Sequence, residues 1–394
     1  MNQDKKFLLV TSFYNNPPEH LELTFKNVLN QTYQNWTLIV GDDFSAEPEY
    51  RTWLKNEILK LNDPRIIYYD VKEKRELYLY QNFFHHLDYD YYFDLDSDDI
   101  IDPNILQTYH NHFEMYPEVM SIYGDSTMTN VEGHLQQYFF VKPPEDYLAE
   151  FNYRSTNDVN QHWKDRSSYN MYGHARCMRR PTESRMHMNK NTRTSTDTLF
   201  TFYNLTRGKH LHIPRRMYTY VRRDGSDSGW MSVEEHREFN TNASYYIDKY
   251  SNMEPTGHIP VYDHLYNYTS AISACKFLDS VDRVSLVADI SDADQELIKT
   301  LYHDKTILFN DFDCPNIIVP WKELSESSQE RLLTSLNIFE RVTIYNHAEG
   351  EFDNMEDASD HFNTDHQSLL DVIKGRMFGY GWFTFFRHMT ITKG

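Results

Sequence analysis

The chain has 394 residues, of which 40% are hydrophobic and 15% aromatic, and it carries a formal net charge of −20. Its length predicts two or three folded domains, and its composition excludes a disordered polymer. A charge this negative argues against a polyanionic partner for the chain as a whole.

The N-terminal part of the sequence alternates short apolar runs with helical patterns. We expect strands over residues 7–10, 36–40, 65–69, 91–95 and 119–123, with helices near 21–29, 49–61 and 77–87 and another from Pro103. Each strand is a continuous apolar run, which is typical of a parallel sheet covered on both faces. Beyond residue 125 the pattern is less regular, with strands over 138–141, 210–213 and 217–221 and a helix near 196–206.

A second alternation begins near residue 283, with strands over 284–288, 306–309, 317–319 and 342–345 and helices over 292–302 and 327–336. The sequence therefore predicts an α/β protein with a mostly parallel central sheet and a smaller C-terminal α/β domain. We expect a first domain over 1–229 with halves 1–125 and 126–229, a helical linker over 230–257, and a C-terminal domain of unassigned role over 258–394.

Polar residues follow three of the predicted strands at their carboxyl ends. They are Thr11, Tyr14 and Asn15, then Asp42 and Asp43, and finally Asp96, Asp98 and Asp99. Ligands of open parallel sheets bind beyond the carboxyl ends of the strands, so we expect these groups to line one crevice. No glycine-rich phosphate loop follows the first strand, which argues against a dinucleotide enzyme or a P-loop nucleotidase.

The cluster Asp96-Ser97-Asp98-Asp99 indicates a divalent cation. Three neighbouring carboxylates repel one another and are costly to desolvate without a counter-charge. Mg²⁺ and Mn²⁺ bind carboxylate oxygens and complete their shell with water and substrate phosphates. The alternative is a solvated acidic turn that caps the helix at Pro103.

Three segments match motifs of a known family, in the family's order and spacing. They are Thr11–Asn15 (TSFYN), Asn27–Ser45 (NVLNQTYQNWTLIVGDDFS), and Leu95–Asp99 (LDSDD) followed by Pro103. Through these motifs, residues 7–123 resemble the nucleotide-sugar-binding half of family 2 glycosyltransferases, which have the GT-A fold.

The resemblance implies a role for three carboxylates: Asp43 would contact the donor base, Asp96 its ribose, and Asp98 the metal, Mg²⁺ or Mn²⁺. The other residues expected to bind the donor are Thr11, Tyr14, Asn15, Asn82, Arg222 and Arg223. The family often carries A-R-N before the aspartate cluster, whereas Tyr80-Gln81-Asn82 keeps only the Asn. Base recognition is therefore expected to differ.

The second half resembles the family more loosely, over residues 173–180, 195–199 and 220–226. The resemblance implies that Asp197 is the general base, although Thr196 replaces the usual Glu. The residues expected to bind the acceptor are His174, Arg176, Arg179 and Arg180.

Arg223 stands where the family often has a metal-binding His, and a guanidinium cannot ligate a cation. We therefore expect Asp98, water and the diphosphate to hold the metal, with Arg223 as an additional phosphate contact. The alternative is that Arg222 and Arg223 themselves neutralise the diphosphate.

Residues 161–223 carry fourteen Lys and Arg against three Asp and Glu, a net charge of +11 that leaves −31 for the rest of the chain. A diphosphate needs only two or three of these cations, so the surplus predicts an anionic acceptor. Clustered Lys and Arg are typical of nucleic-acid binding, and we favour a modified DNA base, extruded from the duplex, over a phosphorylated or anionic glycan. The alternative is that the segment pairs with the acidic remainder of the chain or with a partner subunit.

The cysteines Cys177, Cys275 and Cys314 are far apart and odd in number, which excludes a disulfide framework and favours a reducing compartment. The apolar run Phe7–Val10 is too short for a signal peptide, and no run of about 20 apolar residues occurs. We expect a soluble cytoplasmic protein without membrane insertion.

Together these features predict an inverting glycosyltransferase that moves a hexose or pentose from a nucleoside-diphosphate sugar to an acceptor hydroxyl. Two alternatives stay open. A nucleotidyltransferase would release pyrophosphate from a nucleoside triphosphate, and a non-catalytic module would bind nucleotide-sugar or nucleic acid without turnover.

Overall fold

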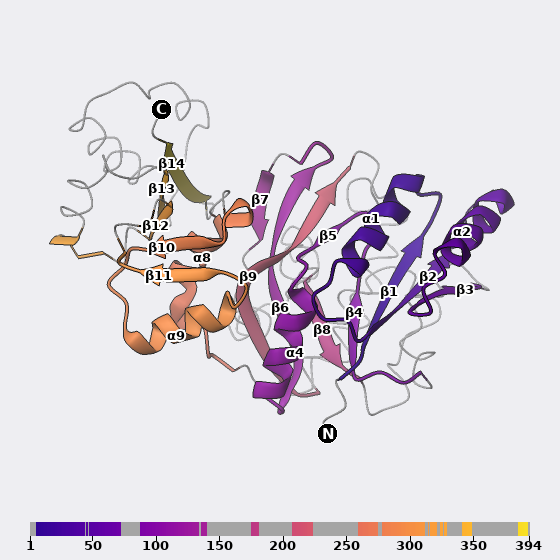
Figure 1. Ribbon diagram of the computed structural model, residues 1–394, viewed down its shortest axis with the longest axis horizontal. Helices are drawn as coiled ribbons and strands as arrows, with labels where there is room; N and C mark the ends of the chain where they lie inside the picture. Colours follow the sequence, from indigo (N-terminus) through magenta and orange to yellow (C-terminus); the bar gives the residue numbers. More distant parts are fainter. Residues whose placement is uncertain are drawn as a thin grey trace, which may run out of the picture. The chain divides into compact units, whose positions relative to one another are not determined.

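The computed structural model describes residues 5–43, 45, 47–71, 87–133, 135–139, 175–180, 207–223, 259–274, 278–311, 314, 316–320, 324–325, 327–328, 341–348 and 385–392. The chain divides into two compact units, Met1–Val261 and Tyr262–Gly394, and both are α/β (Figure 1). The predicted boundaries after residues 229 and 257 fall outside the described residues and stay predictions.

The first unit is built on a nine-stranded sheet in the order β3-β2-β1-β4-β8-β6-β9-β5, with β7 added on β6. The strands are β1 (Phe7–Phe13), β2 (Trp36–Asp42), β3 (Ile66–Tyr69), β4 (Tyr91–Asp94), β5 (Ile100–Ile101), β6 (Val119–Asn130), β7 (Leu135–Phe139), β8 (Arg176–Arg179) and β9 (Lys209–Arg222). The strands from β3 to β4 run parallel, whereas β8 is antiparallel to both β4 and β6. The predicted α/β class with a parallel first half is confirmed.

The parallel strands are apolar because they are covered on both faces. Phe7, Leu9, Leu38 and Phe93 are fully buried, as expected for a sheet between layers of helices.

Cys177 on β8 is a buried free thiol, and burial raises its pKa well above the ordinary value. Within the described part of the chain, no helix is long and apolar enough to cross a bilayer.

The described part of the first unit contains three helices: α1 (Pro18–Leu29), α2 (Pro48–Leu61) and α4 (Ile105–Met115). Proline suits the first turn of α1 because its nitrogen needs no hydrogen-bond partner there. The helix buries Leu21 and Val28, but it also buries Asn27, whereas Leu29 is exposed. The inner face of α1 is therefore partly polar, and those polar groups reach the site described below.

β9 is one strand of 14 residues where two short strands were predicted. Pro214 lies in its middle and has no N–H to donate. The pairing with β6 shifts at this point, since Gly124 pairs with Ile213 but Asp125 pairs with Arg216. The predicted break was wrong because this irregularity accommodates the proline without ending the strand.

The second unit has a five-stranded sheet in the order β11-β10-β12-β13-β14. Its strands are β10 (Arg283–Leu286), β11 (Thr306–Phe309), β12 (Asn316–Pro320), β13 (Arg341–Ala348) and β14 (Phe385–Thr392), and only β14 is antiparallel to its neighbour. The described helical elements are η5 (Asp263–Leu265), α8 (Tyr266–Ala274), η6 (Leu278–Ser280) and α9 (Asp292–Leu301). Ser291 caps α9 by accepting a hydrogen bond from the Asp294 N–H at 3.2 Å. This unit agrees with the predicted smaller α/β domain.

Candidate functional site

The carboxyl ends of β1, β2 and β4 meet at one edge of the first sheet. The register pairs Phe13 with Asp42 and Val10 with Asp94, so the loops that follow these three neighbouring strands emerge together. The sequence predicted this convergence. It brings the segment after Phe13, the Asp42 turn and the aspartate cluster to one place, where a ligand of an α/β sheet binds.

Asp42 organises the loop after β2. Its carboxylate accepts hydrogen bonds from the Ser45 N–H, at 3.0 Å, and from the Ser45 hydroxyl, and it lies 3.3 Å from the Nε of Arg51. Ser45 Oγ in turn accepts a hydrogen bond from the Asn15 N–H at 2.9 Å. Asn15 is in the left-handed region with φ 52°, which Asn tolerates better than most residues. Asp42 therefore ties the β1 and β2 loops together, and the next carboxylate, Asp43, is buried at the same edge.

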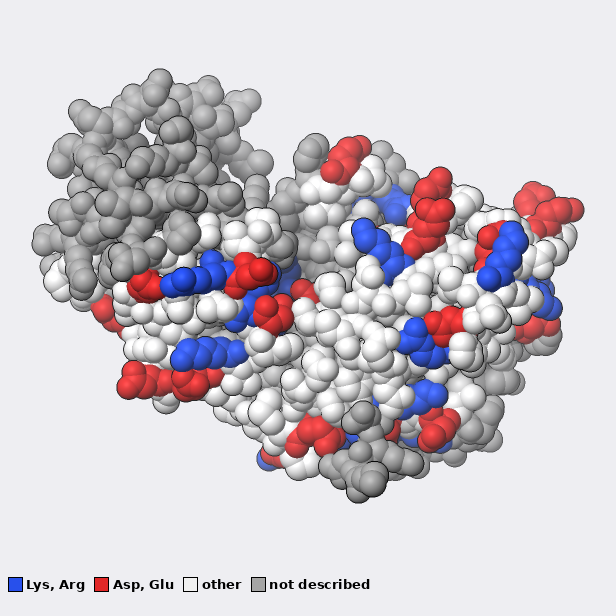
Figure 2. Space-filling model, viewed as in Figure 1, with Lys and Arg blue, Asp and Glu red and all other residues white. Residues whose placement is uncertain are grey.

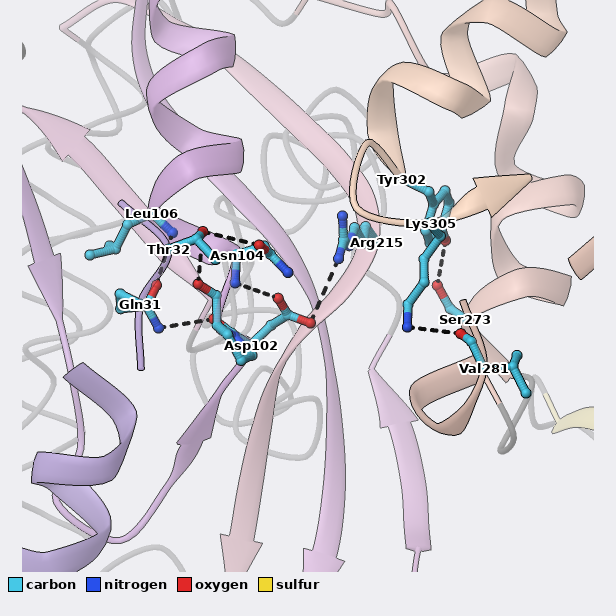
Figure 3. Close-up of polar contacts among 11 residues, drawn as sticks. Gln31, Thr32, Asp102, Asn104, Leu106, Arg215, Ser273, Val281, Tyr302 and Lys305 are labelled. Atoms are coloured by element: carbon cyan, nitrogen blue, oxygen red, sulfur yellow. Dashed lines mark hydrogen bonds and ion pairs between the residues drawn. The ribbon is translucent and has the colours of Figure 1, made fainter. Parts of the chain in front are cut away.

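Asn27 on α1 and Gln31, just after that helix, hold the loop that follows β4. Asn27 Nδ2 donates to the carbonyl oxygen of Asp99 at 2.7 Å, and Gln31 Nε2 donates to that of Asp102 at 3.0 Å. Figure 3 shows Gln31 beside Asp102, whose carboxylate also lies 3.7 Å from Nη2 of Arg215 on β9. The aspartate loop is thus fixed from two sides, by a helix and by a distant strand.

Asp99 helps to fix this loop, because both oxygens of its carboxylate accept hydrogen bonds from β9. It is fully buried, and its carboxylate accepts hydrogen bonds from the Tyr218 hydroxyl and from the Val221 N–H, both at 2.8 Å. Tyr218 also accepts from the Asp96 N–H at 3.4 Å. Because Tyr218 lies 119 positions after Asp99, no local sequence pattern predicts this contact. The protein itself therefore satisfies the Asp99 carboxylate, which leaves Asp98 as the predicted metal-binding residue of the cluster.

Asp98 faces Arg223, which directly follows β9. The Nε of Arg223 lies 3.5 Å from Oδ2 of Asp98, and each side chain is about one-quarter exposed. The described residues contain no group of three His, Cys, Asp or Glu side chains that could hold a metal. A single partly exposed carboxylate nevertheless fits Mg²⁺ or Mn²⁺, which take most of their ligands from water and substrate phosphates.

The remaining predicted donor residues are distributed around this edge. Thr11 on β1 is buried, and its hydroxyl makes no hydrogen bond to the described residues. Tyr14 is 47% exposed, and Arg222 is exposed at the end of β9. The three predicted residues that lie outside the described part of the chain are Asn82, His174 and Asp197.

The predicted acceptor arginines on and after β8 have partners inside the domain. Arg176 forms a largely buried ion pair with Asp94 at 3.1 Å. Arg179 donates to two backbone carbonyls, at 2.7 Å and 2.5 Å, and Arg180 lies over an aromatic ring. Over the described part of the face in Figure 2, basic and acidic side chains are interspersed. Part of the positive charge of residues 161–223 therefore compensates acidic or carbonyl oxygens of the same unit.

Comparison with known proteins agrees with the motifs. Residues 9–184 match the sequence model of glycosyl transferase family 2. A search of curated proteins found no match. Among solved structures, the chain is similar to TarS 1–349 of S. aureus, with 13% identity and a TM-score of 0.42 over 76% of this chain and 79% of that one. TarS 1–349 in complex with UDP-GlcNAc is 14% identical with a TM-score of 0.44, over 75% of this chain and 81% of that one.

Proposed function

We propose that the protein is an inverting glycosyltransferase, which moves a sugar from a nucleotide-sugar donor to an acceptor hydroxyl and inverts the configuration at the anomeric carbon. The proposal proceeds from the match of residues 9–184 to the glycosyl transferase family 2 model. The observation that carries the proposal is the edge of the first sheet, where the loops after β1, β2 and β4 meet and Arg223 lies beside Asp98. This edge offers polar side chains for a nucleoside and positive charge for a diphosphate.

The nucleoside of the donor would lie against the β1 and β2 loops. Asp43 would contact the base and Asp96 the ribose, and the residues that complete this part of the site would be Thr11, Tyr14, Asn15 and Asn82. The diphosphate would lie toward the end of β9, where Arg222 and Arg223 supply guanidinium donors that suit phosphate oxygens.

Asp98 would hold Mg²⁺ or Mn²⁺ together with water and the donor diphosphate. When bound, such an ion stabilises the negative charge that develops on the leaving nucleoside diphosphate. Arg223, 3.5 Å from Asp98, would supply a second positive charge for the same phosphates. Asp99 and Tyr218 position the loop that carries Asp98.

Asp197 would remove the proton of the acceptor hydroxyl as that oxygen attacks the anomeric carbon and the nucleoside diphosphate leaves. A positioned carboxylate of this kind contributes about 100- to 10,000-fold to the rate. The order of motifs supports this role.

The experiment is a screen of nucleotide-sugars for release of nucleoside diphosphate, repeated with Asp197→Asn. We expect the substitution to reduce turnover by about 100-fold or more while the affinity for nucleoside diphosphate stays within about twofold. Release of pyrophosphate from a nucleoside triphosphate would instead indicate a nucleotidyltransferase. Donor binding without turnover by the unmodified protein would indicate a non-catalytic module.

The acceptor is proposed to be anionic, with a modified base in DNA favoured over a phosphorylated or anionic glycan. The support is the net positive charge of residues 161–223. Part of that charge is neutralised within the protein, because Arg176 and Arg215 pair with Asp94 and Asp102, and the remainder would be available to an anionic acceptor. Transfer should be measured with hydroxylated DNA and with an anionic polysaccharide side by side. Transfer to the polysaccharide alone would refute the DNA preference.

A further inference from the structure

His20 lies in the first turn of α1, close to the proposed diphosphate site. It is only 5% exposed. Its Nδ1 lies 3.0 Å from Nδ2 of Asn16, whereas its Nε2 is buried and has no hydrogen-bond partner among the described residues. Buried polar atoms in proteins nearly always have a partner, so an unsatisfied ring nitrogen indicates that something else binds there.

The hydrogen-bond pattern assigns the tautomer of His20. The Tyr14 N–H donates to Oδ1 of Asn16 at 2.5 Å, which fixes the orientation of the Asn16 amide. Asn16 Nδ2 therefore donates to Nδ1 of His20, and it also donates to Oγ of Ser97 at 3.3 Å. Because Nδ1 accepts, the ring proton is on Nε2. Burial, aided by the charge of Arg223, lowers the pKa of His20 to about 4, so the ring is neutral near pH 7.

The unsatisfied Nε2 is thus a hydrogen-bond donor. A protonated Nε2 cannot ligate a cation, so His20 does not replace the missing metal ligand. Arg223, whose charge acts on His20, also has a buried Nε that makes no hydrogen bond to the described residues, although it lies 3.5 Å from Asp98. Both N–H groups adjoin the aspartate loop, His20 through Asn16 and Ser97 and Arg223 through Asp98. Two buried N–H donors at the same loop match an anion with several acceptor oxygens.

We propose that the Nε2–H of His20 donates a hydrogen bond to a phosphate oxygen of the bound nucleoside diphosphate, beside Arg223. This inference rests on the proposed function, because it assigns a further binding residue to the same donor site. Asn16 then acts as a positioning residue: it orients the ring of His20 and connects it to Ser97 in the aspartate loop.

Two substitutions separate the two nitrogens of the ring. His20→Gln places an amide N–H near the position of Nε2 and gives up the contact with Asn16. His20→Asn keeps a polar atom near the position of Nδ1 and removes the donor at Nε2. A purely structural role predicts that Asn is the better replacement, whereas donation to phosphate predicts that Gln is.

The assay is titration calorimetry of the full chain with UDP, GDP, ADP, CDP and TDP in buffer containing Mg²⁺, continued with the tightest binder. We expect His20→Asn to bind about 10- to 100-fold more weakly, as for loss of a hydrogen bond to a charged group, and His20→Gln to stay within about threefold. Equal binding by the unmodified chain and His20→Asn, or equal losses in both variants, would overturn the inference.

A structure of the unmodified chain with the same nucleotide provides a measurement that does not depend on the folding of a variant. We expect a phosphate oxygen within about 3.2 Å of Nε2, and a nucleotide bound with its phosphates away from His20 would contradict the inference. If the unmodified chain binds none of the five nucleotides, the proposed function itself fails. If it binds one but His20 makes no contribution, only the role of His20 fails.

Discussion

The contact between Tyr218 and Asp99 predicts a measurable loss of stability in Tyr218→Phe. Asp99 is fully buried, and its carboxylate accepts one 2.8 Å hydrogen bond from Tyr218 and another from the Val221 N–H. Phenylalanine removes the first of these and also leaves the Asp96 N–H without its 3.4 Å partner. A hydrogen bond to a charged group contributes about 1.5–3 kcal/mol, and the backbone contact is long, so we expect a total loss of about 2 kcal/mol.

The assay is urea unfolding of the unmodified chain and of Tyr218→Phe, with the slope compared as well as the midpoint so that a change in the unfolded state is recognised. Tyr116→Phe is the matched control, because the Tyr116 hydroxyl makes no hydrogen bond to the described residues, and it should change the free energy of unfolding by less than about 0.5 kcal/mol. A loss below about 0.5 kcal/mol in Tyr218→Phe, with an unchanged slope, would refute the view that Asp99 depends on Tyr218.

Three further substitutions test neighbouring contacts. Asn27→Ala removes the 2.7 Å hydrogen bond to the Asp99 carbonyl, and urea unfolding should show a loss of about 2 kcal/mol together with weaker nucleotide binding. Arg176→Gln removes the 3.1 Å, largely buried ion pair with Asp94, so the same assay should show a loss of about 3 kcal/mol. In the folded chain the pKa of His20 is about 4, below its ordinary 6.5, so as the pH falls the unfolded chain takes up a proton at a higher pH than the folded chain does. The resulting loss of stability, roughly 3 kcal/mol, should appear as the pH falls from 6.5 to 4 and be smaller in His20→Gln, as measured by unfolding across that range.

Much of the fold could be predicted because its signals are local. β11 (Thr306–Phe309) was predicted residue for residue, since a short apolar run between polar segments is sufficient. β14 was missed because Arg387 and His388 interrupt its apolar pattern. The parallel half of the first sheet depends on continuous apolar runs, whereas the continuity of β9 past Pro214 depends on the pairing with β6, which the sequence of β9 alone does not contain.

The sequence predicts the position of the aspartate cluster but not the different roles of its carboxylates. The pattern identified the loop, but neighbouring carboxylates are chemically identical, and only their partners distinguish them. Asp99 turns toward Tyr218 and Val221 and stabilises the fold, whereas Asp98 faces Arg223 and stays partly exposed. Tyr218 and Val221 lie near the end of β9 and Arg223 directly follows it, all more than 100 positions after the cluster. Asp99 is therefore satisfied within the fold, and what makes Asp98 a candidate metal ligand is its partial exposure beside an arginine that can also bind phosphate. His20 was missed for the opposite reason: a single histidine in a helix has no pattern, and its importance appears only when the orientation of the Asn16 amide leaves its Nε2–H without an acceptor.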